Sequence, residues 1–216
     1  ALFLLGACTH EGDMAAPEIT DTVTPITDTD TTVTETYAVR LFDSTIGQMV
    51  ATTEGDTVTV DYEYRNNGRG PTLAETIELG EDGLPVGWKV DGATTFGNEI
   101  HESFKLADGV ATWTDTTGPG TANRQVPTLY IPQNGTPYAL AVYAKALLAD
   151  EDHTLPAWPA GELFLQELEG LSLDGEGGPV QLTTYALVGE DVDPTYFLTD
   201  GNGDLFALIS PRFVIV

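Results

Sequence analysis

Short runs in which apolar and polar residues alternate, separated by turn residues, make up most of the chain after Thr36. In Thr57–Tyr64, for example, every second residue is valine or tyrosine. A period of two places these side chains on one face of a β-strand, and we expect that face to point into a core. Runs of this kind predict strands over residues 37–43, 46–54, 57–65, 72–79, 85–90, 100–105, 110–115, 161–169, 180–189, 195–199 and 205–209.

The segments between these runs are rich in glycine, aspartate and asparagine, as in Asn66-Asn67-Gly68 and Ala107-Asp108-Gly109. Such residues tolerate the positive φ angles that tight hairpin turns need. Strands that follow one another at hairpin spacing pair with their sequence neighbours. We therefore expect an antiparallel meander sheet, curved or closed into a half-barrel.

One helix is predicted within this β-rich order. Thr136 is a good N-cap, Pro137 suits the first helical position, and residues 138–149 carry apolar side chains at helical spacing. The acidic residues 150–152 and then Pro156 end the helix. We expect its apolar stripe to cover the open face of the sheet. The predicted fold class is therefore mainly β, with a curved antiparallel meander sheet and one covering α-helix.

The chain begins with a short apolar run, ALFLLGA, followed by Cys8. This run is typical of the end of a secretory signal peptide, with its basic start missing. Leu5-Gly6-Ala7-Cys8 also resembles the bacterial lipobox, in which the cysteine is lipidated and the chain is cleaved just before it. The resemblance implies a mature protein that begins at Cys8 and is held to a membrane by lipid. Because Thr9 is not aspartate, the same pattern implies the outer membrane. The alternative is an apolar strand containing a buried free cysteine.

Residues 11–36 contain no lysine or arginine and few large apolar side chains. Burial of so little apolar surface does not offset the entropy of ordering the chain, so we expect an extended, disordered, acidic and threonine-rich tether. The predicted organisation has three parts. They are a signal-peptide remnant (residues 1–7), a lipidated cysteine with its tether (8–36), and a β-rich domain (37–216).

The charge of the chain is strongly negative, with 34 acidic and 8 basic residues and a formal net charge of −26. Such a chain repels polyanions, so we expect no nucleic-acid partner. A single cysteine also excludes a disulfide within the chain.

No catalytic or metal-binding motif is found in the sequence. The histidines, His10, His101 and His153, form no H-x-H or H-E-x-x-H pattern, and no G-x-S-x-G is present. Residues 200–204, DGNGD, resemble the start of a calcium loop but lack its later glycine and acidic ligand. A hairpin turn explains them better. We therefore expect no cofactor in this chain.

The densest unusual patch is the turn Tyr64–Pro71, which holds two of the eight basic residues. The planar guanidinium groups of Arg65 and Arg69 could receive a carboxylate from a ligand or another domain. The alternative is a tight turn whose arginines pair with nearby acids such as Glu63 and Glu75.

The run VDYEYRNNGRGPTLAETIELGEDGLPVGWKVDGATTFGNEIHESF, with the final SPRFVIV, resembles the β-rich region that precedes the amidohydrolase barrel in secreted bacterial proteins. The resemblance implies that a C–N hydrolase domain, with its metal, follows Val216. The apolar end of the chain also favours a continuation, since folded domains usually end in polar residues. No H-x-H metal motif is present here, so this chain would be an accessory domain.

Two other function classes remain open. A curved sheet with an apolar concave face would suit a periplasmic lipoprotein that binds an apolar ligand. A large apolar outer patch would instead suit a structural module of the cell envelope. In each case we expect an extracytoplasmic protein anchored to the outer membrane or the periplasmic face by lipid. Its partners would be that membrane and, for the hydrolase, a catalytic domain in the same chain.

Overall fold

The computed structural model describes residues 32–175, 177–189, 192–210 and 214–216. Within them, fifteen strands form one sheet in the order β8-β7-β6-β5-β4-β3-β2-β1-β15-β14-β13-β12-β11-β10-β9. The strands are β1 (Val33–Leu41), β2 (Ser44–Glu54), β3 (Thr57–Tyr64), β4 (Thr72–Leu79), β5 (Pro85–Ala93), β6 (Glu99–Ala107), β7 (Val110–Asp115), β8 (Gly118–Asn123), β9 (Leu129–Tyr130), β10 (Thr154–Trp158), β11 (Glu162–Gly175), β12 (Gly178–Gly189), β13 (Val192–Thr199), β14 (Leu205–Ile209) and β15 (Val214–Ile215). The helix is α1 (Ala139–Ala149).

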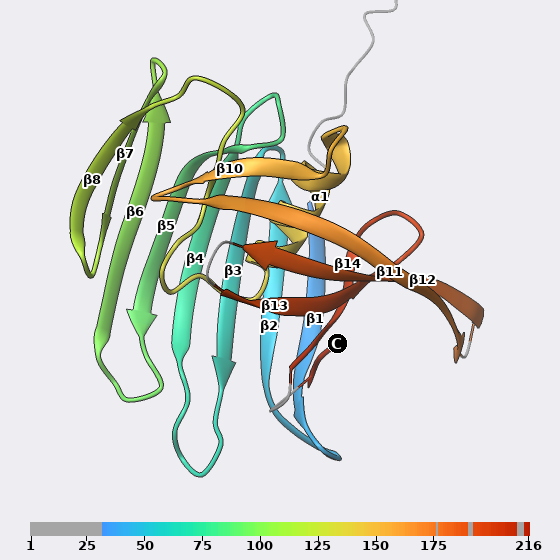
Figure 1. The fold of residues 1–216 in the computed structure, drawn as a ribbon. Helices are drawn as coiled ribbons and strands as arrows, with labels where there is room; N and C mark the ends of the chain where they lie inside the picture. Colours follow the sequence, from blue (N-terminus) through green and yellow to red (C-terminus); the bar gives the residue numbers. More distant parts are fainter. Residues whose placement is uncertain (1–31, 176, 190–191, 211–213) are drawn as a thin grey trace, which may run out of the picture.

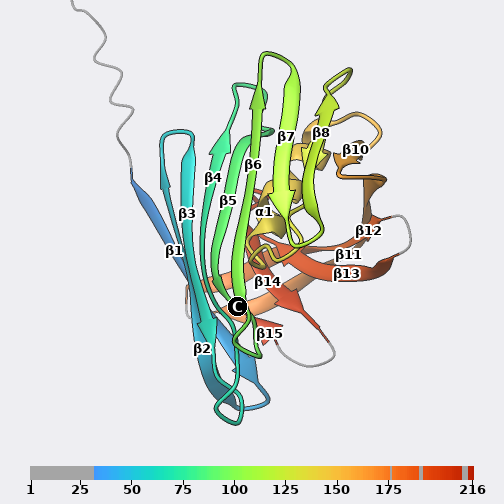
Figure 2. The same ribbon diagram turned by 90° about the vertical axis from the view of Figure 1, so that its left-hand side faces the viewer.

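The chain builds this sheet as two meanders. Strands β1–β8 pair in sequence order, and strands β10–β15 pair in order back towards β1, where β15 joins the two meanders. The neighbouring strands are antiparallel except for β9 and β10. Figure 1 shows the second half of the sheet running across the first, and Figure 2 shows α1 between the two halves. The predicted curved antiparallel meander with one helix is confirmed.

The core lies between the two halves of the sheet and around α1. Eight of the eleven helical residues are buried, so the helix is enclosed rather than covered along one stripe. Fully or almost fully buried side chains come from both halves and from the helix, as in Ile77, Val90, Leu147, Leu165 and Phe197. The alternation along β3 is also confirmed, because Val58, Val60 and Tyr62 are buried and Tyr64 is partly buried against the core.

The start of the helix differs from the prediction. Residues 137 and 138 form a turn in which Ala139 N–H donates to the carbonyl of Thr136 (3.1 Å) and Leu140 N–H to that of Pro137 (3.2 Å). No side-chain hydrogen bond caps the helix. The predicted N-cap, Thr136, uses its hydroxyl elsewhere, as described below. The predicted end at Ala149 is confirmed, with Asp150 N–H bonded to the carbonyl of Leu147 (3.2 Å).

The boundary between tether and sheet lies earlier than predicted. Strand β1 begins at Val33, which pairs with Thr53 of β2, so residues 33–36 belong to the sheet. Glu35 helps to hold residues 33–36 in place, because its carboxylate accepts hydrogen bonds from the hydroxyls of Tyr37 and Tyr138, both at 2.9 Å. The rest of the predicted tether, the signal remnant and Cys8 lie outside the described residues.

Four short strands were not predicted. Strand β8 contains two glycines and a proline, and β10 contains Pro156, which the sequence favoured as a helix stop. Strands β9 and β15 have two residues each. Residues 214 and 215 of the apolar chain end form β15, which pairs with β1 and β14, and this pairing explains their β-branched character.

The described residues contain no helix that is both long enough and apolar enough to cross a membrane.

Candidate functional site

Two carboxylates are buried on the concave face of the sheet. Glu75 on β4 and Glu102 on β6 are 2% and 3% exposed. Both are in register with Val90 on β5, so they lie in one row, two strands apart. Each occupies an inward position of its strand, where the alternation calls for an apolar residue. A buried carboxylate needs hydrogen-bond donors, since an unpaired buried charge is very costly.

Glu75 is held by donors from β5 and from the segment before α1. Trp88 Nε1 donates to Oε1 (2.7 Å), and Thr136 N–H lies 3.2 and 3.3 Å from the two carboxylate oxygens. The Thr136 hydroxyl also donates to Oε2. Burial raises the pKa of Glu75 to about 7, although the hydrogen bonds from Thr136 and Trp88 oppose this rise. The nearby Glu102 raises it further.

Glu102 holds the same segment two residues earlier. Asn134 donates to its carboxylate through the backbone N–H (3.2 Å) and through Nδ2 (2.5 Å). Residues 131–138 are therefore fastened to the sheet at two points, Asn134 and Thr136. We call Glu75 and Glu102, with their donors Thr136 and Asn134, the clamp. The clamp fixes the path of the chain into α1.

Stacked aromatic rings adjoin this clamp. Phe104 and Tyr130 stack at 4.2 Å between ring centroids, and Trp88 lies 6.2 Å from Tyr130 and 6.0 Å from Tyr143. The Tyr143 hydroxyl donates to the carbonyl of Tyr130 (3.1 Å). The Tyr130 hydroxyl is buried and has no hydrogen-bond partner among the described residues. Together with α1, these rings pack on the concave face of the sheet.

The Arg65 side chain forms its hydrogen bonds within the turn that contains it. Its guanidinium donates to the carbonyls of Tyr64 (2.7 Å) and Pro71 (2.9 Å) and to the Thr72 hydroxyl (2.7 Å). Glu63, one of the two predicted pairing partners, lies 3.9 Å away. The other, Glu75, is buried and bound elsewhere.

Arg69 lies opposite Asn66 in the same turn, where the two backbones exchange hydrogen bonds of 2.7 and 3.1 Å. Both Arg65 and Arg69 line an open groove of about 490 Å³ with residues 94–97. The structure thus brings the two predicted arginines together. Binding of a carboxylate there stays a prediction.

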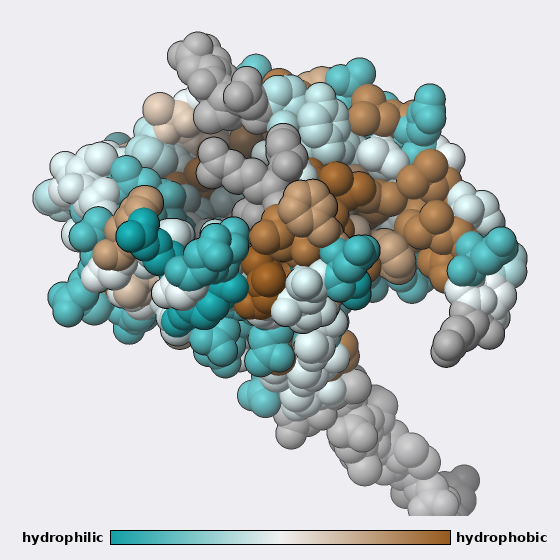
Figure 3. Space-filling model, turned by 90° about the horizontal axis from the view of Figure 1, so that it is seen from below, coloured by the Kyte–Doolittle hydropathy of each residue, from teal (hydrophilic) through white to brown (hydrophobic). Residues whose placement is uncertain are grey.

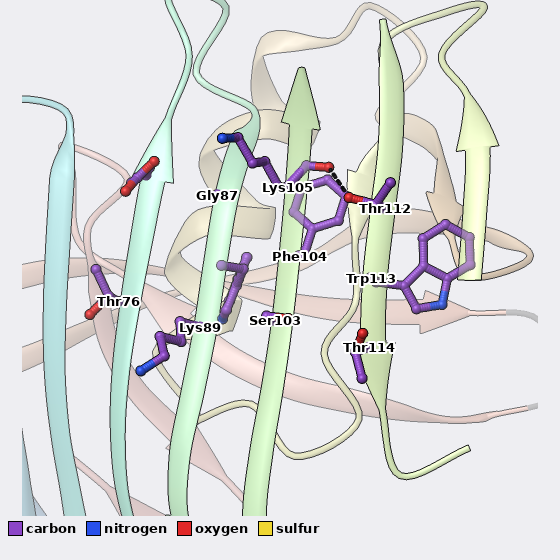
Figure 4. A pocket seen from close by; sticks show the side chains of 11 residues that line it. Thr76, Gly87, Lys89, Ser103, Phe104, Lys105, Thr112, Trp113 and Thr114 are labelled. Atoms are coloured by element: carbon purple, nitrogen blue, oxygen red, sulfur yellow. Dashed lines mark hydrogen bonds between the residues drawn. The ribbon is translucent and has the colours of Figure 1, made fainter. Parts of the chain in front are cut away.

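A second groove of about 490 Å³ lies on the convex face of β4–β7 (Figure 4). Small residues, Gly87 and Ser103, separate Lys89 from Lys105. Lys89 already forms a 2.5 Å ion pair with Asp91. Trp113 also lines this groove, and its indole packs against Gly120, 2.2 Å from the position that a Cβ of that glycine would take. The groove is an exposed surface with two lysines rather than an enclosed site.

The DGNGD segment is a hairpin turn between β13 and β14, as predicted. Asp200 Oδ1 accepts hydrogen bonds from the backbone N–H groups of Asn202 (2.8 Å) and Asp204 (3.0 Å). Asp204 pairs with Lys145 on α1 (2.7 Å). Both carboxylates therefore have protein partners.

The two described histidines are His101 on β6 and His153 after α1. His101 is exposed and pairs with Asp91 (2.9 Å), and His153 is in the turn after α1. In the part of the chain that the structure describes, no three His, Cys, Asp or Glu side chains are grouped so as to hold a metal ion.

The hairpin of β11 and β12 extends beyond the rest of the sheet (Figure 1). Past Leu165 on β11, the burial pattern changes from alternating to continuously exposed. Its exposed apolar side chains include Leu168 (42%), Leu171 (39%) and Leu173 (45%). Figure 3 shows hydrophobic residues gathered on this side of the molecule.

A small apolar cluster lies on the outer face of β12–β14, separate from the main core. It consists of Leu182, Leu198 and Ala207, with Val180 and Phe206 packed against it. Leu171 pairs with Leu182, and Leu173 with Val180, so the exposed leucines of β11 continue this cluster along the hairpin. The leucines at alternate positions 171 and 173 are a sequence signal for it, but the strand predicted over 161–169 ends before them.

No family model and no curated protein sequence matches this chain. Its structure is similar to the crystal structure of a β-barrel-like protein of the domain of unknown function DUF1849 from Brucella abortus, with a TM-score of 0.51 and 14% sequence identity. The alignment covers 84% of this chain and 92% of that chain. At this level of identity the likeness shows a common fold, in which an antiparallel sheet curls into a barrel-like shape.

Proposed function

We propose that this chain is a non-catalytic accessory module of a cell-envelope lipoprotein, and that it binds another protein through hairpin β11–β12. The observation that carries the proposal is the exposure of Leu168, Leu171 and Leu173 on a hairpin that extends beyond the sheet. Contiguous exposed apolar residues are typical of interaction surfaces on soluble proteins. The buried carboxylates, by contrast, are used to hold residues 131–138.

The filled concave face favours this surface over an internal ligand site. α1 and the aromatic rings around Tyr130 occupy the space that a carrier of apolar ligands would keep for its cargo. The proposed binding surface is therefore the hairpin with the adjoining Leu182 cluster.

The lipid anchor at Cys8 and a hydrolase domain after Val216 belong to the same proposal. They rest on the lipobox-like sequence and on the resemblance to the region that precedes amidohydrolase barrels. Cys8→Ala is expected to move the protein from the membrane fraction to the soluble fraction without changing its thermal stability. An unchanged membrane fraction would contradict the anchor.

The hairpin is tested by site-specific photocrosslinking in cells of the source organism. A photoreactive amino acid replaces Leu171 on the hairpin or, as a matched control, Val110 on β7, which is also exposed and apolar (40%). We expect a discrete protein adduct from position 171 and none from position 110. Equal adducts at both positions, or none at either, would overturn the proposal.

A further inference from the structure

We propose that the free edge of β11 accepts an extended, lysine- or arginine-containing segment of a partner protein as an additional antiparallel strand. This inference rests on the proposed function and specifies how the hairpin binds. It is drawn from the backbone of β11, from the side chains around its bulge and from the charge of this half of the sheet.

The backbone of β11 is paired on one side from Leu163 to Gly175, apart from one bulge, and on the other side only at its start. β12 pairs with it through Gly175, whereas β10 reaches only Phe164, opposite Thr154. The next amide, Leu165 N–H, donates to the carbonyl of His153 (3.0 Å). Amide directions alternate along a strand, so Glu167 N–H points to the same edge. Among the described residues, no strand pairs with this edge beyond that point.

Long unpaired edges of this kind are templates for strand addition, and proteins normally protect them. The β11 edge has a bulge, in which Leu168 and Glu169 lie opposite Thr184. Around it is an open groove of about 510 Å³ lined by Glu167, Leu168, Glu169, Leu171 and Thr184. The groove thus offers both carboxylates and apolar contacts next to free backbone groups, which suits a strand that alternates basic and apolar side chains.

The charge of this half of the sheet selects the partner. No lysine or arginine occurs between Lys145 and Arg212, while Glu167, Glu169 and Asp174 lie on β11. These three acids therefore have no cation on the surrounding strands. A basic segment complements them. A second copy of this chain would place its own acidic edge about 5 Å away, and an anionic membrane would repel the hairpin in the same manner.

The test uses the full chain and three labelled ten-residue peptides. The first alternates lysine and valine, the second has glutamate in place of lysine, and the third is the lysine peptide with alternate backbone amides methylated. Binding is measured by fluorescence anisotropy at low and high salt, and amide hydrogen exchange is followed at Glu167. We expect the lysine peptide to bind, to slow exchange at Glu167, and to bind at least tenfold more weakly in 0.5 M salt.

The methylated peptide separates strand addition from simple charge attraction, since its charge is unchanged and its hydrogen bonds are blocked. We expect it and the glutamate peptide to bind at least tenfold more weakly. On the protein, Glu167→Pro removes the edge amide and should weaken binding tenfold or more. Glu167→Gln removes only the charge and should weaken it by a few fold. Proline is tolerated on edge strands, and circular dichroism checks the fold of both variants.

Equal affinities for the lysine peptide and its methylated form would overturn the inference. Self-association abolished by Glu167→Pro, or binding to vesicles of anionic or zwitterionic lipid that depends on Leu171, would also overturn it. If crosslinking from position 171 succeeds while no peptide binds, the proposed function stands and strand addition fails. If crosslinking fails as well, both fail.

Discussion

Trp88 Nε1 donates a 2.7 Å hydrogen bond to Oε1 of Glu75, and this pair joins β5 to β4 inside the core. The donors around Glu75 are neutral, so they satisfy its oxygens without supplying a positive charge. Burial therefore dominates, and the pKa of Glu75 rises to about 7. The clamp that holds residues 131–138 thus contains a group that titrates near neutrality.

This titration predicts a loss of stability as the pH rises. The unfolded chain releases the Glu75 proton near pH 4.5, whereas the native chain keeps it until pH about 7. The stabilising contribution is therefore complete below pH 4.5 and is lost as the pH rises through about 7. The difference corresponds to about 3 kcal/mol. Urea unfolding between pH 5 and pH 8 should show it.

Glu75→Gln is the control, because glutamine is neutral at every pH in this range. Its free energy of unfolding should fall less than that of the native protein between pH 5 and pH 8. The comparison is not affected by Asp82, Asp91 and Asp115. Their pKa values are lowered from 3.8, so these groups change the stability only below the pH range of the measurement. If the free energy of unfolding of the two proteins depended on pH in the same way, Glu75 would be ionised throughout this range.

Asn134→Asp should damage the second fastening point. It places a carboxylate where Asn134 Nδ2 now donates to Glu102 at 2.5 Å, and two like charges at that distance repel. We expect a loss of about 2 kcal/mol at pH 7, partly recovered at pH 4, where the introduced aspartate is partly protonated. Asn134→Ala loses only the side-chain hydrogen bond, so its deficit should not depend on pH. A pH-independent deficit in the aspartate variant would contradict the clamp.

Tyr130 and Tyr143 provide a matched pair of hydroxyl deletions. Because the Tyr130 hydroxyl is buried without a described partner, Tyr130→Phe should leave stability unchanged or raise it by about 1 kcal/mol. Tyr143→Phe removes the bond to the Tyr130 carbonyl and should cost about 1 kcal/mol. Thermal and urea unfolding of both variants measure the difference. A larger loss for Tyr130→Phe would reveal a partner for its hydroxyl.

Most individual strands and the helix of this fold can be predicted from the sequence, because they depend on residues that are close together in the chain. The valines and tyrosines of Thr57–Tyr64 predicted β3 and its inward face. Pairing between strands that are far apart in the chain cannot be predicted from local sequence. Strand β15 joins β1 through Val39 and Ile215, and β8 persists despite its glycines and proline because β7 pairs with it. Tertiary pairing outweighs weak strand propensity in such segments.

The clamp was predictable in part. Glu75 lies between Leu73 and Ile77 at the inward positions of β4, so a carboxylate interrupts an apolar face. That interruption is a signal of a buried polar group. Its partner was not predictable, because Thr136 is distant in sequence and has the features of an ordinary N-cap. The hydroxyl that capping would use is bound to Glu75 instead.

The turn around Arg65 supplies the last prediction. Arg65 reaches three carbonyls and the Thr72 hydroxyl with one planar group, whereas no side-chain bond of Arg69 is found among the described residues. Lysine keeps the charge but cannot reproduce this fork of donors. We therefore expect Arg65→Lys to lower the free energy of unfolding by about 1 kcal/mol, and Arg69→Lys to leave it within about 0.5 kcal/mol. Urea unfolding of the two variants measures both values. If Arg69→Lys were the more damaging change, Arg65 would not be the residue that closes the turn, and its guanidinium would be available for an external carboxylate.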